Sequence, residues 1–142
     1  MKKYILLSLI LGLVLACSND TPRNNNPYLP SYNFSYPINL SLPQFSGLNT
    51  NLNPIAFTDP SDINLIIMKV SGTDYRAWNA NCPNQSLTSC SKMSLHGLNA
   101  KCNCEDIFEY SLFTGVSTNG GQYTMVPYRV EVIDDHTIRV FN

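Results

Sequence analysis

Apolar and polar residues alternate with a period of two through much of the chain from Ile38 onward. Such alternation is typical of β-strands that bury one face. The expected strands are residues 38–42, 75–80, 107–113 and 128–133, with a last strand after the Asp134-Asp135 turn, and the continuous apolar run over residues 63–70 is expected to form a buried strand. Asn119-Gly120-Gly121 adds a turn signal, and no segment combines helical spacing with caps at both ends. The pattern predicts an all-β fold, a small antiparallel β-sandwich or barrel.

Residues 18–37, "SNDTPRNNNPYLPSYNFSYP", show neither a strand nor a helix period. Asn, Pro and Ser dominate this segment, so it has too little apolar surface to order itself. We therefore expect a flexible tether over residues 17–37, whose tyrosines could dock its end onto a single domain over residues 38–142.

The first sixteen residues are a separate unit, with two lysines, an apolar run from Tyr4 to Ala16, and then Cys17. This order predicts a signal peptide over residues 1–16, and the run is shorter than the ~20 residues of a membrane-spanning helix. "VLAC" resembles the lipobox of bacterial lipoproteins, which implies that Cys17 is lipidated and anchors the mature chain in a membrane. The alternative is a plain secretory signal followed by an incidental cysteine.

The expected location is the bacterial cell envelope, in the outer membrane on its periplasmic side or at the cell surface. Asp20 close behind Cys17 resembles the surface-export signals of Bacteroidetes lipoproteins. The formal net charge of -1 offers no polyanion-binding patch, so we expect no nucleic-acid partner.

Export to an oxidising compartment makes disulfides possible. Setting Cys17 aside leaves an even number of cysteines: Cys82, Cys90, Cys102 and Cys104. Four cysteines allow three pairings, and the short spacing of Cys102 and Cys104 disfavours a bond between those two. Two pairings stay open at this point: Cys82–Cys102 with Cys90–Cys104, or Cys82–Cys104 with Cys90–Cys102.

Other candidate residues have ordinary structural interpretations. His96, before Gly97, and His136, in "DDHT", are expected in exposed loops, and the cysteine spacing does not match a zinc site. Glu105 and Asp106 are expected to face solvent, and Tyr75 and Trp78 to pack in the core. No catalytic residue is identified. A thiol–disulfide activity of Cys102 and Cys104, with Lys101 as a basic neighbour, is a further hypothesis.

The two cysteine boxes, "CPNQSLTSC" and "CNCE", together with "FEYSLFTG" and "VPYRVEV", resemble the Rieske iron–sulfur domain over residues 36–142. The Asn-rich tether and the end of the chain are also similar to small Rieske-like lipoproteins of Bacteroidetes. The resemblance implies antiparallel β-sheets with both cysteine-bearing loops at one tip. In the family, the first box reads Cys-x-His and the second Cys-x-x-His, and these four residues bind a 2Fe-2S cluster.

The chain departs from this ligand pattern at both histidines. Cys82 and Cys102 stand at the cysteine positions, whereas Asn84 and Glu105 stand at the histidine positions. A neutral amide is a poor ligand for iron, and a carboxylate is a harder one than imidazole. The resemblance therefore implies disulfides Cys82–Cys102 and Cys90–Cys104, the latter matching the extra cysteine pair of the respiratory-type branch.

We expect a cluster-free, disulfide-stapled module, not an enzyme, that acts structurally or binds an unknown envelope protein. The alternative is an electron-transfer protein that binds a 2Fe-2S cluster through the ligand set Cys82, Cys102, Glu105 and Asn84.

Overall fold

The computed structural model describes residues 26–142, so the expected signal peptide and Cys17 lie outside the described residues. The elements in chain order are β1 (Ser35–Asn39), the 3₁₀-helix η2 (Pro43–Asn49), β2 (Ile55–Thr58), β3 (Asn64–Ser71), β4 (Asp74–Asn79), β5 (Ser94–His96), β6 (Asn99–Lys101), β7 (Glu109–Ser111), β8 (Pro127–Asp134) and β9 (Thr137–Phe141). Within this part of the chain, no helix is long and apolar enough to cross a bilayer.

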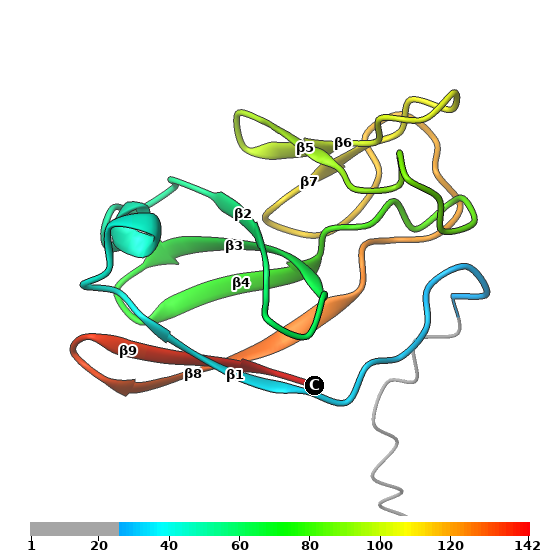
Figure 1. Cartoon of the computed structure of the whole chain (residues 1–142). Helices are drawn as coiled ribbons and strands as arrows, with labels where there is room; N and C mark the ends of the chain where they lie inside the picture. Colours follow the sequence, from blue (N-terminus) through cyan, green and yellow to red (C-terminus); the bar gives the residue numbers. More distant parts are fainter. Residues whose placement is uncertain (1–25) are drawn as a thin grey trace, which may run out of the picture.

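The strands form two antiparallel sheets, which confirms the all-β expectation. The larger sheet has six strands in the order β1-β9-β8-β4-β3-β2, and the smaller has three in the order β5-β6-β7. Figure 1 shows the larger sheet curled on itself, with the smaller sheet and the long loops gathered at one end of it. The two cysteine boxes lie in these loops, as expected from the resemblance.

Strand β3 contributes apolar side chains to two separate cores, one on each of its faces. Leu65 and Ile67 point into the core inside the curled sheet, together with Ile38, Ile138 and Val140. Ile66 and Met68 point the other way, into a second core that also holds Trp78, Tyr110 and Leu112. Because successive side chains of a strand alternate between faces, a continuous apolar strand is the sequence signature of burial on both sides.

The domain begins earlier than residue 38. β1 starts at Ser35 and pairs with β9, and Leu29 is buried in the first core. Asn26 is buried as well, and its Nδ2 donates a hydrogen bond to the carbonyl oxygen of Pro83 at 2.8 Å. Residues 26–37 therefore belong to the folded domain, because strand pairing and one buried leucine supply the order that composition alone does not.

Several short elements differ from the sequence expectation. The strand expected over residues 38–42 ends at Asn39, whose side-chain oxygen accepts a hydrogen bond from the Ser41 amide and turns the chain into η2. The strand expected over residues 107–113 is reduced to β7. The helix η2 and strands β2, β5 and β6 were not expected, since segments of three to seven residues carry too few positions for a period to show.

Candidate functional site: the two cysteine loops

Two cysteines stand where strands run into the loops at the tip. Cys82 follows β4 closely, and its amide donates to the carbonyl of Ser91 at 2.8 Å. Cys102 directly follows β6, and its amide donates to the carbonyl of Phe108 at 2.8 Å. Both cysteines are thus fixed by backbone hydrogen bonds across the base of their own loops.

The disulfides are Cys82–Cys102 and Cys90–Cys104, with Cα–Cα distances of 5.5 Å and 5.2 Å. The pairing implied by the resemblance is confirmed, and the alternative pairing is wrong. Cys102 and Cys104 are each bonded to a different cysteine, and the hypothesis of a thiol–disulfide activity at these residues stays a prediction. We refer to Cys82–Cys102 as the inner disulfide and to Cys90–Cys104 as the outer disulfide.

The two disulfides differ in their surroundings. Cys82 and Cys102 are 0% and 1% exposed and belong to the second core, beside Trp78 and Tyr110. Cys90 and Cys104 are only partly buried, at the surface of the tip. The inner disulfide is therefore part of the core packing, whereas the outer one is reachable from solvent.

Asn84 is held by three hydrogen bonds. Its Nδ2 donates to the hydroxyl oxygen of Tyr110 at 2.5 Å and to the carbonyl of Tyr123 at 2.8 Å. Its Oδ1 accepts from the amide of Tyr123 at 2.8 Å. A Cβ atom on Gly121 would lie 2.8 Å from Nδ2 of Asn84 and 2.9 Å from the Tyr110 hydroxyl, so this network requires a glycine there. The side chain of Asn84 fastens the first cysteine loop to residues 121–123.

Tyr110, on β7, is the buried partner in this network. It is 0% exposed, and burial raises the pKa of its hydroxyl, while the hydrogen bond from Asn84 acts in the opposite direction. No pattern in the sequence singles out Tyr110, Gly121 or Tyr123 as partners of Asn84. The one available signal was the resemblance, which implied that Asn84 stands at a histidine position.

Glu105 lies on the exposed part of the second loop, next to exposed Asp106. Within residues 26–142, no three His, Cys, Asp or Glu side chains gather in a metal-binding arrangement. The donor chemistry also does not fit a Rieske-type cluster, because both polar atoms of the Asn84 amide are engaged and both cysteine sulfurs are bonded to each other.

The two histidines lie at an exposed strand end and in an exposed turn. His96 is the last residue of β5 rather than a loop residue, and its side chain is 72% exposed. Its Nδ1 lies 3.2 Å from Oε1 of Glu109. Hydrogen bonds from Asn99 and then His96 lower the pKa of Glu109. His136 lies in the exposed β8–β9 turn, as expected, where its amide donates to the Asp134 carboxylate at 2.8 Å.

Trp78 connects the tip to the larger sheet. It is 6% exposed, and its Nε1 donates to the carbonyl oxygen of Leu112 at 3.0 Å, which satisfies its polar atom within the core. Gly115 packs against its ring, and a Cβ there would lie 2.6 Å from Cζ3. The expectation that Trp78 is a core residue is confirmed, while Tyr75 is only partly buried.

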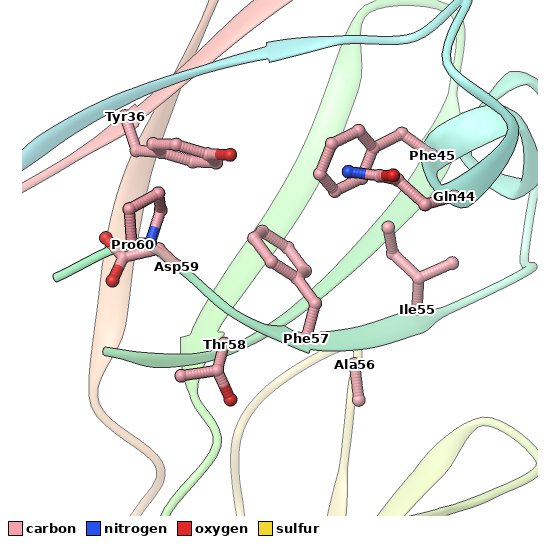
Figure 2. A pocket seen from close by; sticks show the side chains of 9 residues that line it. All are labelled: Tyr36, Gln44, Phe45, Ile55, Ala56, Phe57, Thr58, Asp59 and Pro60. Atoms are coloured by element: carbon pink, nitrogen blue, oxygen red, sulfur yellow. The ribbon is translucent and has the colours of Figure 1, made fainter. Parts of the chain in front are cut away.

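A groove of about 420 Å³ lies between β1, η2 and β2 (Figure 2). The Phe57 ring centroid lies 6.1 Å from that of Tyr36 and 5.1 Å from that of Phe45. β1 and β2 are the two outer strands of the larger sheet, and Pro37 within β1 removes one backbone donor. A proline in an outer strand hinders the addition of a further strand.

Comparison with known proteins shows the fold only. No family model and no curated protein matches the chain. A chain of the reduced complex between oxygenase and ferredoxin in carbazole 1,9a-dioxygenase is 15% identical with a TM-score of 0.51, covering 77% of this chain and 28% of that chain.

Two smaller solved proteins are matched over nearly their whole length. The ferredoxin of carbazole 1,9a-dioxygenase from Nocardioides aromaticivorans IC177 is 19% identical, with a TM-score of 0.48, covering 74% of this chain and 96% of that chain. A structure described as an NADH-dependent nitrite reductase small subunit from Mycobacterium tuberculosis is 10% identical, with a TM-score of 0.47, covering 79% and 97%. The fold of residues 26–142, with its two disulfide-bonded loops at one tip, is Rieske-like.

Proposed function

We propose that this chain is a lipid-anchored lipoprotein of the bacterial cell envelope, with a Rieske-like domain that carries no iron–sulfur cluster. The domain serves as a structural or interaction module for an envelope protein, and the two disulfides replace the cluster as the staple of its tip. The observation that carries this proposal is the Asn84 side chain, which stands where the family has a histidine and is committed to Tyr110 and Tyr123.

Three features support a cluster-free tip. The amide of Asn84 would have to give up its hydrogen bonds before its oxygen could approach a metal, and buried or half-buried polar groups left without partners are unfavourable. The sulfurs of Cys82 and Cys102 would have to be reduced first. Glu105 lies on an exposed stretch of loop, and among the described residues it belongs to no group of three or more His, Cys, Asp or Glu side chains that could hold a metal ion.

The anchor is argued from the sequence. The basic start, the apolar run and "VLAC" ahead of Cys17 fit a lipoprotein signal, and an acylated cysteine holds a chain on a membrane without a spanning helix. The polar residues after Cys17 would then set the folded domain off from the bilayer. Export also supplies the oxidising conditions that two disulfides need.

The first test uses the full-length chain, extracted from bacterial membranes with detergent under air. We expect no visible absorption band, no stoichiometric iron, and the inner and outer disulfides in peptide mapping by mass spectrometry. Iron bound in stoichiometric amount, with Cys82 and Cys102 unlinked, would instead identify an electron-transfer protein with an unusual 2Fe-2S ligand set.

The second test concerns the anchor. Cells fed a labelled fatty acid should label the full-length protein but not a Cys17→Ala variant, which should also leave the membrane fraction. A Ser18→Ala variant is the matched control and should behave like the wild type. If the Cys17→Ala protein stays in the membrane fraction, the lipoprotein part of the proposal is wrong.

A further inference from the structure

We propose that the outer disulfide Cys90–Cys104 is a thiol–disulfide exchange site, opened by a dithiol protein that attacks the sulfur of Cys104 and releases Cys90. The inner disulfide stays closed in this exchange. The inference does not rest on the absence of a cluster, because it uses only the outer cysteine pair, which contributes no ligand in either of the functions considered above.

The sulfurs of the outer disulfide are more accessible than those of the inner one. Exchange requires a thiolate to approach one sulfur of the bond directly, so buried disulfides react slowly. Cys82 and Cys102 lie within the second core, whereas Cys90 and Cys104 are only partly covered. An attacking thiol can therefore reach the outer pair while the fold is intact.

The hydroxyl of Thr88 lies beside the outer disulfide. The Thr88 Oγ1 atom lies 3.2 Å from Sγ of Cys90 and 3.6 Å from Sγ of Cys104. A disulfide sulfur has no proton, so the hydroxyl is the donor in these contacts. A hydrogen bond to a sulfur becomes stronger when that sulfur gains charge as a thiolate.

The neighbouring Ser91 leaves this hydroxyl available as a donor. Ser91 Oγ donates to the carbonyl of Ser86 at 3.1 Å and accepts from the amide of Thr88 at 2.7 Å. The Thr88 hydroxyl is 3.3 Å from the same Oγ. Because the Ser91 proton is already donated to Ser86, Ser91 Oγ can only accept a hydrogen bond from Thr88. Ser91 thus holds Thr88 in place, and the Thr88 proton can turn to whichever acceptor is the more negative.

The same geometry selects the leaving sulfur. Thr88 is closer to Cys90 than to Cys104, so it stabilises charge on Cys90 better. Charge on Cys104 would instead arise directly before Glu105 and Asp106 in the chain, and like charges disfavour one another. Both effects favour attack at Cys104 with Cys90 as the departing thiolate.

Opening the outer disulfide leaves its two loops joined by other contacts. Asn103 donates from Nδ2 to the carbonyl of Lys92 at 2.7 Å, and Ser94 donates to Oδ1 of Asn103 at 2.9 Å. The inner disulfide joins the bases of the same two loops. The reduced tip should therefore stay folded, with only the segment around Cys90 released.

Each step of the exchange forms one sulfur–sulfur bond and breaks another. The partner's thiolate forms a bond to Sγ of Cys104 while the Cys90–Cys104 bond breaks, and Cys90 leaves as a thiolate that takes up a proton. The partner's second thiol then attacks the mixed disulfide and releases Cys104 as a thiol. Two electrons and two protons pass to this chain, and the partner dithiol becomes a disulfide.

The test uses the full-length protein in detergent, treated with graded dithiothreitol, quenched with an alkylating reagent and mapped by mass spectrometry. We expect Cys90 and Cys104 to be alkylated at least about tenfold faster than Cys82 and Cys102, because access limits the exchange rate. Circular dichroism at the same stage should be unchanged. Simultaneous opening of both disulfides, or earlier opening of the inner one, would overturn the proposal.

Two further measurements separate the chemistry from simple exposure. Thr88→Val should slow opening of the outer disulfide roughly three- to tenfold through loss of the hydroxyl donor, while Thr124→Val, on another exposed loop, should not. A dithiol protein that retains only its attacking cysteine should be trapped as a mixed disulfide on Cys104. An unchanged rate in Thr88→Val, or trapping on Cys90, would refute the assigned roles.

Discussion

The Nδ2 atom of Asn84 lies 2.5 Å from the hydroxyl oxygen of Tyr110, although the two residues are 26 positions apart in the sequence. Asn84 belongs to the first cysteine loop and Tyr110 to β7, so this bond joins the tip to the second core. The side chain of Asn84 thus acts as a structural link between the first cysteine loop and β7.

Replacing Asn84 with Ala should destabilise the domain. The change removes three hydrogen bonds and leaves the buried Tyr110 hydroxyl without its amide donor, so we expect a loss of about 2–3 kcal/mol in the free energy of unfolding. Urea unfolding followed by Trp78 fluorescence measures this loss. Asn33→Ala, at an exposed position, is the control, and equal stability of the two variants would contradict the assigned role.

Replacing Gly115 with Ala should disturb the Trp78 packing. Gly115 has φ +71°, and the added Cβ would lie 2.6 Å from the indole ring, so we expect a loss of roughly 2–4 kcal/mol and a shifted fluorescence maximum. Gly72 has a similar φ of +49° with no atom within 4 Å of an added Cβ. Gly72→Ala should therefore cost only about 1 kcal/mol and leave the Trp78 emission unchanged.

Stability should fall at alkaline pH through the buried tyrosines. Burial raises the pKa of Tyr128 to about 12 from the ordinary value of 10.0. The folded state therefore holds this proton more tightly than the unfolded chain. The resulting stabilisation is complete below pH 10 and is lost as the pH rises through about 12. Urea midpoints across this window, with tyrosinate absorbance recorded in parallel, measure the effect.

The matched variants for the alkaline experiment are Tyr128→Phe and Tyr28→Phe. Tyr128→Phe removes the titrating group and the acceptor for Asn79 Nδ2, which lies 3.0 Å from the hydroxyl. It should be less stable at neutral pH by about 1–2 kcal/mol and lose less stability on the way to pH 12. Tyr28 is 39% exposed, so Tyr28→Phe should follow the wild type. An unchanged alkaline slope in Tyr128→Phe would rule out this residue as the source.

Removing the inner disulfide should cost more than removing the outer one. The sequence separations of 20 and 14 residues predict similar chain-entropy contributions of about 3 kcal/mol each. The double change Cys82→Ala, Cys102→Ala also leaves a void in the second core, which should add about 1 kcal/mol or more. Cys90→Ala with Cys104→Ala is the comparison in urea unfolding. A larger loss for the outer pair would contradict the described difference in burial.

The sequence by itself determined the β class, the long strands and the strand that is apolar on both faces. These features follow from side-chain alternation, which is a local property of the chain. The resemblance to the Rieske domain also implied that Cys82 and Cys102 stand at equivalent points of two boxes, with Asn84 and Glu105 at the remaining ligand positions. From the residues alone, however, two cysteine pairings stayed open, because spacing restricts a disulfide without selecting its partner.

Only the tertiary structure decided which atoms meet. The amide of Asn84 finds Tyr110 and Tyr123 across 26 and 39 residues, and no local pattern encodes a contact of that range. Strands as short as β5 and β6 form because they pair with neighbouring strands. Residues 26–37 are ordered because β1 pairs with β9 and Leu29 packs in the first core. Burial, likewise, separates an inner disulfide from an outer one, since exposure depends on what packs against a sulfur and not on its position in the chain.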